Sequence, residues 1–347
     1  MPRAFITGAS GFIGGALLRA LLQRGWEVRV LLRPGSDPKG LQGIEAPFER
    51  CPGDLRHRDS LRGHLVGCDL LFHVAARYSL WNPRPREIYE DNVVGTRNIL
   101  EAAEEAGVSR VVYTSTVGVL RPSQDGRLAD ETSMARLDEV HGHYRRSKWQ
   151  AEQCALEFAR RGLPVVIVNP SAPVGPGDVK PTPTGRMIID FLKGRMTGYT
   201  DTGLNLVAVE DVAEGHILAA AKGVPGQRYI LGAENMTLLG VFRILSELTG
   251  VPVPRLRVPA MLLLPIALAL AGVSAITRRP PFVCLEEARM ARARMHFDIA
   301  RARRDLGFKP GPVPAALERA VRWFRHHGYL SGQRGVSGPT ALKAEVS

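Results

Sequence analysis

The fold of this 347-residue chain is decided by the stretch Ala4-Phe5-Ile6-Thr7-Gly8-Ala9-Ser10-Gly11-Phe12-Ile13-Gly14. Its first four residues are apolar or β-branched and predict a buried strand. Glycines follow at once, and residues 15–24 have the apolar spacing of a helix that ends at Gly25. A second apolar strand is predicted over residues 27–32. The order strand, glycine turn, helix, strand predicts the first unit of a doubly wound dinucleotide-binding fold.

The three glycines have separate physical tasks in such a turn. Gly8 permits the tight bend out of the strand, Gly11 lets a pyrophosphate approach the backbone, and Gly14 lets the helix pack close to the sheet. The helix N-terminus adds free N–H groups and the positive end of a dipole. A βα turn without a ligand is the alternative. The pattern therefore predicts dinucleotide contacts from Thr7, Gly8, Ser10, Gly11, Phe12, Ile13 and Gly14.

Arg33, which ends the second predicted strand, bears on which dinucleotide binds. NAD sites place a carboxylate about twenty residues past the glycines, where it accepts a hydrogen bond from the ribose 2′-hydroxyl. A guanidinium at that position pairs with a 2′-phosphate instead. Arg33 therefore favours NADP(H) over NAD(H), and a solvated charge at the strand end is the alternative.

Strands and helices continue to alternate beyond this unit. Strands are predicted over 69–74, 110–113 and 165–169, and helices over 87–106 and 144–161. Short connections between them imply a parallel sheet that is covered on both faces. The expected fold class is α/β, a Rossmann doubly wound parallel sheet with a smaller mixed α/β C-terminal lid over the substrate. Ligands of such sheets bind at the carboxyl ends of the strands.

The composition excludes several classes of protein. Hydrophobic residues make up 45% and charged residues 23% of the chain, which is typical of a globular protein and not of a disordered one. The net charge of +12 raises the question of an anionic partner, but no nucleic-acid-binding motif accompanies it, so no nucleic acid is expected. The four cysteines form no metal-spaced cluster, so no metal is expected. The N-terminal pattern has no signal peptide, and the expected location is the cytoplasm.

The segment Tyr144-Arg-Arg-Ser-Lys148 carries the predicted chemistry. A tyrosine and a lysine four residues apart share one face of a helix. An ammonium beside the phenol favours the phenolate and lowers the pKa of the tyrosine toward useful acid–base chemistry. Upstream, Thr114-Ser115-Thr116 ends a strand. A hydroxyl there can hold a substrate oxygen while Tyr144 delivers or removes its proton.

In combination these motifs resemble the extended short-chain dehydrogenase/reductase family over essentially residues 3–330. The resemblance rests on Thr7-Gly8-x-x-Gly11-x-x-Gly14, Gly53-Asp54-Leu55, His73-Val-Ala-Ala76, Asp91-Asn92-Val-x-Gly95-Thr96, Thr114-Ser115-Thr116, Tyr144-x-x-x-Lys148 and Asn169-Pro170-Ser171. It implies a catalytic set of Thr116, Tyr144 and Lys148, with Ser115 as the alternative hydroxyl. It also implies cofactor contacts at Asp54, Leu55, Ala75, Ala76, Thr114, Ser115, Tyr144, Lys148, Pro170 and Ser171.

Within this family of epimerases and dehydratases, the chain is similar to dihydroflavonol-4-reductase-like members and in particular to hopanoid-associated sugar epimerases. Residues 72–81, 169–185 and 199–205 carry this likeness. It implies hydride transfer between a nicotinamide and a carbonyl or secondary alcohol, and Arg33 favours NADP(H) for that reaction. The alternative is an NAD(P)-dependent epimerase of a sugar or nucleotide sugar, linked to hopanoid biosynthesis. A binding module without chemistry is disfavoured because Tyr144 and Lys148 are both present.

The second part of the chain is expected to cover the substrate. We expect a Rossmann domain over 1–172 with return segments at about 203–233, a lid over 173–202 and 234–330, and a flexible tail over 331–347. Candidate substrate contacts are Tyr78, Trp81, Ser171 and Arg186, and a structural role is the alternative for each. The expected partner is a small molecule, either a sugar or a lipid-linked compound, and homodimers are common in the family.

Residues 259–276 are a run of eighteen without a charge, preceded by Arg257 and followed closely by Arg278. Eighteen residues are at the lower limit for a membrane-spanning helix, and Pro265 and Gly272 interrupt the run. Three interpretations stay open. They are a buried lid helix, which the soluble pattern around the run favours, a membrane-surface contact with basic flanks, and a true span.

Overall fold

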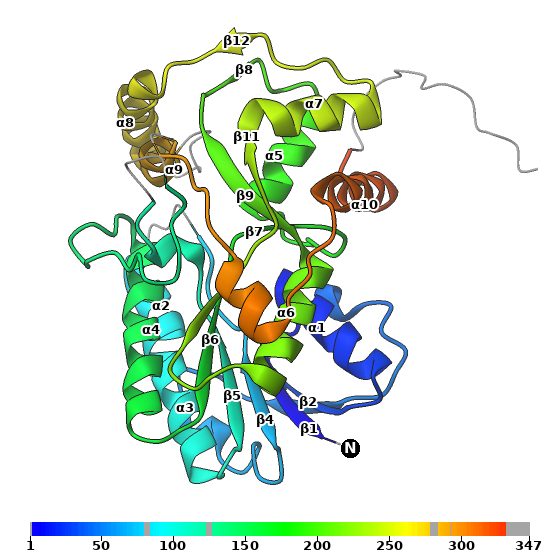
Figure 1. Ribbon diagram of the computed structural model, residues 1–347, viewed down its shortest axis with the longest axis vertical. Coiled ribbons are helices and arrows are strands. Elements are labelled where there is room, and N and C mark those ends of the chain that lie inside the picture. Colours follow the sequence, from blue (N-terminus) through cyan, green and yellow to red (C-terminus); the bar gives the residue numbers. More distant parts are fainter. Residues whose placement is uncertain (1, 80–83, 123–126, 278–283, 292, 331–347) are drawn as a thin grey trace, which may run out of the picture.

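The apolar runs of the sequence form one seven-stranded parallel sheet, with a second unit above its carboxyl edge (Figure 1). The computed structural model describes residues 2–79, 84–122, 127–277, 284–291 and 293–330. The strand order is β10-β6-β5-β4-β1-β2-β3. The strand bounds are β1 (Arg3–Thr7), β2 (Glu27–Leu32), β3 (Glu49–Pro52), β4 (Leu70–His73), β5 (Arg110–Thr114), β6 (Val165–Pro170) and β10 (Arg228–Leu231). The order reverses between β1 and β4, which is where such sheets bind ligands.

Helices cover both faces of this sheet, which confirms the doubly wound α/β class (Figure 1). On one face lie α1 (Phe12–Gln23) and α6 (Val209–Lys222), and on the other lie α3 (Gly95–Glu105) and α4 (His143–Arg160). The helix expected over 87–106 is not continuous. It consists of α2 (Pro85–Tyr89), a π-helical turn over Glu90–Val94, and α3. The π turn holds one extra residue per turn and ends at Gly95, whose missing side chain lets the helix approach Leu55.

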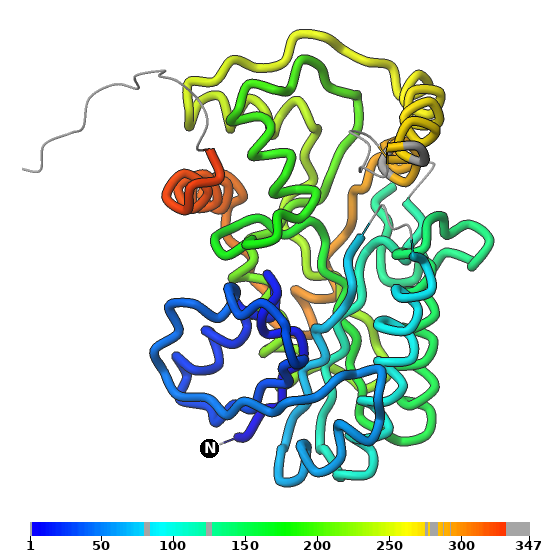
Figure 2. Tube along the Cα trace, turned by 180° about the vertical axis from the view of Figure 1, so that it is seen from behind, coloured from blue at the N-terminus to red at the C-terminus, as the bar shows by residue number. Residues whose placement is uncertain are grey.

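The second unit contains a three-stranded sheet of order β11-β9-β7 and a two-stranded pair, β12 with β8. Its strands are β7 (Ala172–Val174), β8 (Gly198–Tyr199), β9 (Gly203–Ala208), β11 (Glu234–Thr237) and β12 (Leu256–Arg257). Its helices are α5 (Pro183–Leu192), α7 (Leu238–Thr249), α8 (Ala260–Thr277), α9 (Leu285–Met290) and α10 (Val313–His326). Figure 2, seen from behind, shows this unit above the end of the large sheet where the glycine turn lies.

The return segment expected at 203–233 is divided between the two sheets. Strand β9 pairs with β7 and β11, whereas α6 and β10 belong to the seven-stranded sheet. The reason lies in the side chains of β9, because Leu206 packs into the core of the second unit and Val207 packs into the core of the first. One strand therefore contributes to both hydrophobic cores. The tail expected at 331–347 lies outside the described residues.

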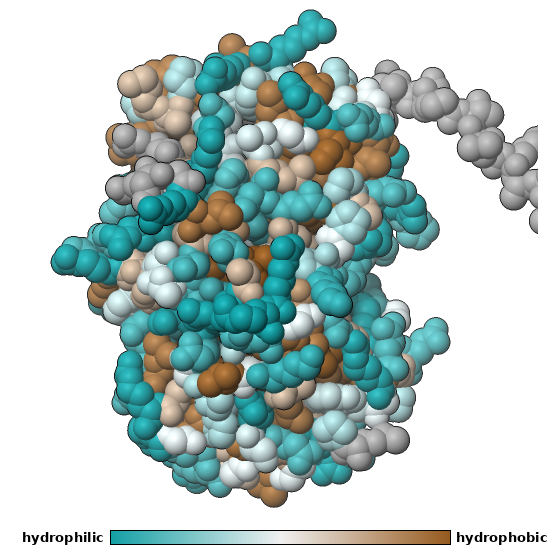
Figure 3. All heavy atoms as spheres, viewed as in Figure 1, coloured by the Kyte–Doolittle hydropathy of each residue, from teal (hydrophilic) through white to brown (hydrophobic). Residues whose placement is uncertain are grey.

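Helix α8, which occupies the uncharged run, lies on the surface of the molecule. Met261 is 74% exposed and Leu268 is 56% exposed, and only a narrow side of the helix, which includes Ala267, is buried. The interpretation as a buried lid helix is therefore wrong for its outer side. Figure 3 shows tan and brown apolar spheres at the upper left, where Figure 1 places α8. Among the described residues, no helix is both long enough and apolar enough to cross a membrane.

Candidate active site

The glycine turn is built as tightly as its sequence predicts. Gly8 has φ +78°, and a Cβ there would lie 2.6 Å from the backbone nitrogen of Ala75. A Cβ on Gly14 would lie 2.1 Å from the carbonyl oxygen of Gly8, so only glycine lets α1 pack this closely. Helix α1 begins at Phe12, and among the described residues no side chain caps it. The first N–H groups of α1 are therefore available to an anionic ligand.

A small pocket opens at this turn. A Cβ on Gly40 would lie 2.0 Å from the carbonyl oxygen of Ser10, so the loop after β2 closes directly over the turn. The pocket brings two lysines, Lys39 and Lys180, to the same place as the turn. Two ammonium groups and a helix N-terminus suit a pyrophosphate. Two carboxylates share the pocket, Asp178 and Asp37, and the latter lies 3.7 Å from the ammonium of Lys39. The pocket is lined by Ser10, Gly11, Phe12, Asp37, Lys39, Gly40, Gly177, Asp178, Val179 and Lys180.

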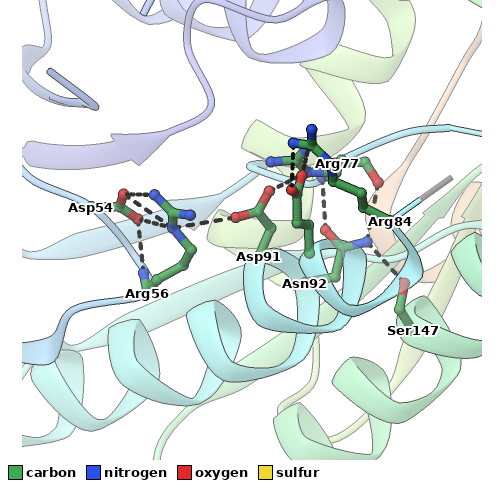
Figure 4. Close-up of polar contacts among 8 residues, drawn as sticks. Asp54, Arg56, Arg77, Arg84, Asp91, Asn92 and Ser147 are labelled. Atoms are coloured by element: carbon green, nitrogen blue, oxygen red, sulfur yellow. Dashed lines mark hydrogen bonds and ion pairs between the residues drawn. The ribbon is translucent and has the colours of Figure 1, made fainter. Parts of the chain in front are cut away.

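The ends of β2 and β3 bring together three charged groups. Arg33 is exposed, and its charge acts on Asp54. The carboxylate of Asp54 accepts hydrogen bonds from Arg56, at 2.6 Å from Nη2 and 3.0 Å from Nε, and this pairing lowers the pKa of Asp54 to about 2 (Figure 4). The carboxylate of Asp54 is thus paired with Arg56, and the guanidinium of Arg33 is the exposed positive charge of these three groups. Arg56 was not among the predicted site residues, although it follows directly after the Gly-Asp-Leu motif.

Buried side chains fix the ends of β1 and β4. Nδ1 of His73 lies 2.7 Å from the hydroxyl of Thr7, and its Nε2 lies 2.9 Å from the hydroxyl of Thr96. Burial lowers the pKa of His73 to about 3, so the ring is neutral. The backbone N–H of Ala75 donates to the Thr7 hydroxyl at 3.2 Å. This network holds Ala75 and Ala76 at the sheet edge, beside Gly8.

Lys148 is buried beneath this edge. Its Nζ donates a hydrogen bond to the carbonyl oxygen of Thr114 at 2.7 Å and lies 4.5 Å from the centre of the Tyr113 ring. Burial lowers the pKa of Lys148 to about 7, and the carboxylate of Glu152 partly opposes the change. At neutral pH the ε-amino group can therefore be either charged or neutral.

Tyr144 lies one helical turn before Lys148 on α4 and interacts with the hydroxyl of Thr116. Its pKa is raised, not lowered as expected, because burial and the Glu286 carboxylate outweigh the hydrogen bond from Thr116. The phenol is therefore protonated at neutral pH and ready to donate. The ring of Tyr78 meets that of Tyr144 edge-on, with centroids 4.4 Å apart.

Side chains from β6 and α4 hold the segment after β5 through hydrogen bonds to its backbone carbonyls. Asn169 donates from Nδ2 to the carbonyl oxygen of Thr116 at 3.1 Å, and Arg145 donates from Nε to that of Gly118 at 2.6 Å. The hydroxyls of Ser115 and Ser171 are buried and have no hydrogen-bond partner among the described residues. Buried hydroxyls of this kind are costly unless a ligand satisfies them.

A polar network connects the Asp54–Arg56 pair with α4 (Figure 4). Nδ2 of Asn92 donates to the hydroxyl of Ser147 at 2.9 Å, and its Oδ1 accepts from the backbone N–H of Arg77 at 2.7 Å. The guanidinium of Arg77 pairs with Asp91, which also lies 3.7 Å from Arg56. The π turn over 90–94 places these acidic and amide groups between the two ends of the site.

The predicted substrate contacts are only partly brought together. Tyr78 lies against Tyr144, and Ser171 follows β6 at the same sheet edge. Arg186 is exposed on α5, where its charge acts on Asp178. Trp81 lies outside the described residues. Within the described ranges no group of three or more His, Cys, Asp or Glu side chains could hold a metal ion.

The residues present fit a dinucleotide with a nicotinamide at one end. A glycine cradle and two lysines suit the pyrophosphate, and Arg33 is exposed just after the end of β2. Leu55 accepts a hydrogen bond from Asn98 through its carbonyl at 2.7 Å, which holds the loop beside Asp54. Ala75, Ala76, Ser115, Pro170 and Ser171 lie at the strand ends between Gly8 and Tyr144.

Comparison with known proteins agrees with this geometry. The NAD dependent epimerase/dehydratase family matches residues 4–232. A Synechocystis protein, provisionally named dihydroflavonol 4-reductase, is 44% identical over 333 residues, which are 95% of this chain and 96% of that protein. Sterol demethylase protein B of Methylococcus capsulatus is 38% identical over 327 residues, 94% of this chain and 99% of that protein. The crystal structure of a nucleoside-diphosphate-sugar epimerase from Pseudomonas aeruginosa has a TM-score of 0.78 at 26% identity, covering 95% of this chain and 99% of that one.

Proposed function

This chain belongs to the NAD dependent epimerase/dehydratase family, within the extended short-chain dehydrogenases/reductases, and from that premise we propose that it is an NADP(H)-dependent reductase of a carbonyl group. That it is an enzyme of the NAD(P)-dependent oxidoreductase type follows from the family. The proposed chemistry is carried by one observation, the Tyr144 phenol beside the Thr116 hydroxyl and one helical turn before buried Lys148. Exposed Arg33, which favours NADP(H), supports reduction over epimerisation.

The chain's own residues divide the proposed chemistry among them. A nicotinamide bound at the sheet edge would supply or accept hydride. The hydroxyl of Thr116 holds the substrate oxygen and fixes its distance from the Tyr144 phenol. Tyr144 donates a proton to that oxygen in reduction and removes one in the reverse reaction. Lys148, when charged, stabilises the phenolate left behind and binds the ribose next to the nicotinamide.

The proposed preference for NADP(H) rests on Arg33. It is exposed at the end of β2, and the nearby carboxylate of Asp54 is already paired with Arg56. A 2′-phosphate there would meet a guanidinium and no free carboxylate. The second unit is proposed to act as the lid, and the substrate is proposed to lie between it and Tyr144, beside Tyr78 and Ser171. The likeness to a sterol demethylase protein supports a lipid-type substrate, and the proposed location is the cytoplasm, with contact to a membrane surface.

A second candidate is an NAD(P)-dependent epimerase of a sugar or nucleotide sugar, linked to hopanoid biosynthesis. The fold of the Pseudomonas epimerase supports it, because that structure matches nearly the whole chain. The same three residues would serve, since epimerisation requires oxidation and then reduction on the other face, with no net change in the cofactor.

One assay separates the two candidates. The purified chain is incubated with NADPH and a panel of ketosteroids and dihydroflavonols, and separately with NAD(P)+ and nucleotide sugars, and the absorbance of reduced nicotinamide is followed in both. Net oxidation of NADPH with formation of an alcohol supports the reductase. Formation of an isomer without net oxidation supports the epimerase and rejects the reductase.

Substitution of Tyr144 tests the assigned chemistry. We expect Tyr144→Phe to lower turnover at least about a hundredfold, because the proton donor is removed, while NADPH binding changes little. Tyr89→Phe, on α2, is the matched control and should keep full turnover. A Tyr144→Phe variant that turns over at the wild-type rate would contradict the proposal.

A further inference from the structure

We propose that the outer face of α8 is a docking surface for an anionic lipid membrane. This α8 face consists of Met261, Leu262, Pro265, Ile266, Leu268, Ala269, Gly272 and Val273, all exposed. Their spacing forms two adjacent stripes, one of residues 261, 265, 268 and 272 and the other of residues 262, 266, 269 and 273. Each stripe repeats at three or four residues, so both lie on one side of the helix.

The α8 face is not the usual solvent side of a surface helix. Such a helix carries polar residues outward, whereas α8 has no charged residue on any side. Its inner side, with Ala267 and Ser274, is already buried against the protein. A contiguous exposed apolar face of this kind marks an interaction site. In Figures 1 and 2 the helix stands at the corner of the second unit, and Figure 3 shows apolar atoms there.

Charge identifies a lipid surface as the occupant. Exposed arginines flank the α8 face, namely Arg255 and Arg257 before it and Arg289 and Arg294 after it. Arg257 and Arg294 share one carboxylate, that of Asp201, at 2.9 Å and 3.8 Å, so the flanks keep an excess of positive charge. From residue 255 to residue 294 the sequence contains seven arginines and two glutamates. An apolar face with basic flanks is the arrangement of helices that lie in the interface of anionic membranes. A second copy of the chain would set these arginines against one another, which disfavours self-association through this face.

The position of α8 connects the docking surface with the proposed active site. Helix α9 packs against α8, as both ribbon views show. The carboxylate of Glu286 on α9 sits against Gly142, which directly precedes α4, and a Cβ on Gly142 would lie 1.7 Å from it. The same carboxylate acts on Tyr144. A membrane bound at α8 would therefore lie beside the catalytic helix, and the benefit to a lipid-type substrate rests on the proposed function.

Vesicle flotation of the full chain tests the docking surface without any measurement of activity. The vesicles are phosphatidylcholine alone or an equal mixture of phosphatidylcholine and phosphatidylglycerol. The wild-type chain should float with the mixed vesicles, bind phosphatidylcholine alone at least about tenfold more weakly, and dissociate in part when salt is raised from about 0.1 M to about 1 M. Absence of binding to the mixed vesicles would overturn the proposal.

Paired variants place the binding on α8. Met261→Glu with Leu268→Glu should weaken binding at least about tenfold, since two charges would have to enter the apolar layer. Val66→Glu with Val224→Glu is the control, because these side chains are 63% and 52% exposed and precede β4 and β10 at the opposite edge of the sheet. Equal binding by the two paired variants would overturn the proposal. A second result would also overturn it: the wild-type chain is a dimer, the Met261→Glu, Leu268→Glu variant is a monomer, and the wild-type chain binds no vesicles.

Hydrogen exchange of the wild-type chain tests the same assignment without a variant, so a misfolded variant cannot affect the result. Amides of residues 260–277 should exchange more slowly in the presence of mixed vesicles than in buffer, and those of residues 12–23 in α1 should be unchanged. Protection confined to other parts of the chain would contradict the assignment. Since neither readout involves turnover, failure of the docking surface and failure of the proposed reductase can be told apart.

Discussion

At the scale of single residues, the site is governed by the cost of burying charge. Lys148 has a pKa lowered to about 7 and Tyr144 has a raised pKa, and burial is the main cause for both. Each group is held toward its neutral form, so the pair can exchange a proton with a substrate without leaving a strongly charged side chain in the interior. The sequence predicted that Tyr144 and Lys148 lie one turn apart on a helix, and α4 places them so. It could not predict the raised pKa of Tyr144, because that shift comes mainly from burial in the folded chain and next from Glu286, which lies far along the sequence.

Burial of Lys148 makes a prediction about stability. Its pKa is lower in the folded chain, about 7, than in the unfolded chain, about 10.5, so between these values only the unfolded chain holds the proton. Stability from this group therefore rises with pH, by about 1.4 kcal/mol per pH unit across that window. Lys148→Met removes the group. We expect the variant to gain stability over wild type at pH 7, and the gain to shrink toward pH 9 in denaturant titrations.

Lys222→Met is the control for that measurement, because Lys222 is exposed. Its stability difference from wild type should not change between pH 7 and pH 9. If the difference in unfolding free energy between Lys148→Met and wild type also stays constant from pH 7 to pH 9, the pKa of Lys148 is not lowered by burial.

Arg33 makes a prediction about cofactor choice. Arg33→Asp replaces a guanidinium that would pair with a 2′-phosphate by a carboxylate that repels it and that can accept from a 2′-hydroxyl. The ratio of NADPH to NADH affinity should fall by about tenfold to a hundredfold, as measured by titration of protein fluorescence. Arg136→Asp, at a side chain 78% exposed, controls for the change in net charge. An unchanged affinity ratio for Arg33→Asp would reject its assigned role.

At the scale of elements, close backbone approach decides what the glycine turn can do. The order of strand, turn and helix was predicted from residues 4–32, and α1 begins three residues earlier than the helical pattern indicated. The difference arises because Phe12 and Ile13 already have helical backbone, although the glycines between strand and helix obscure the apolar spacing. Arg56 and Lys39 were missed for a related reason. Both act through loops whose path past Asp54 and Ser10 is set by tertiary packing and not by local pattern.

Gly14→Ala tests this packing. Its Cβ would lie 2.1 Å from the carbonyl oxygen of Gly8, so α1 must shift away from the turn. We expect a loss of about 1–3 kcal/mol in stability and a nucleotide affinity at least about tenfold weaker, measured by denaturation and by titration with NADPH. Gly272→Ala on α8, where a Cβ would meet nothing within 4 Å, should instead stabilise the chain by about 0.5–1 kcal/mol. Equal effects of the two substitutions would contradict the close approach at Gly14.

At the scale of the whole molecule, two hydrophobic cores share one strand. Uniformly apolar strands predicted the large parallel sheet well, since β1, β4, β5 and β6 are buried on both faces. The placement of β9 could not be predicted from its apolar residues, because nothing in its sequence shows that Leu206 and Val207 pack into different cores. The exposure of α8 could not be predicted either. An all-apolar helix has the same sequence pattern whether it is buried in the protein core or exposed on the surface for another partner to cover.

The outermost strand of the large sheet depends on one buried ion pair. Arg228 on β10 donates to Glu152 on α4 at 2.5 Å, and the Glu152 side chain is fully buried and also accepts from Asn169. Arg228→Met leaves that carboxylate without its charge partner and should cost about 3–5 kcal/mol, measured by denaturant unfolding. Combining it with Glu152→Gln should recover most of the loss. A loss below about 1 kcal/mol for Arg228→Met would show that water or another cation replaces the arginine.

The π turn between α2 and α3 has a consequence for how this protein can change over evolution. A regular helix advances about 100° per residue, so deleting one residue from 90–94 would leave a continuous rod but swing everything before the cut around its axis. Asp91 and Asn92 would then no longer serve Arg56, Arg77 and Ser147 at once. A single substitution at Asp91 or Asn92 would remove the contacts of that side chain alone, whereas a change of length would remove all of them. The number of residues in this turn therefore sets whether Asp91 and Asn92 can contact Arg56 and Ser147 at the same time.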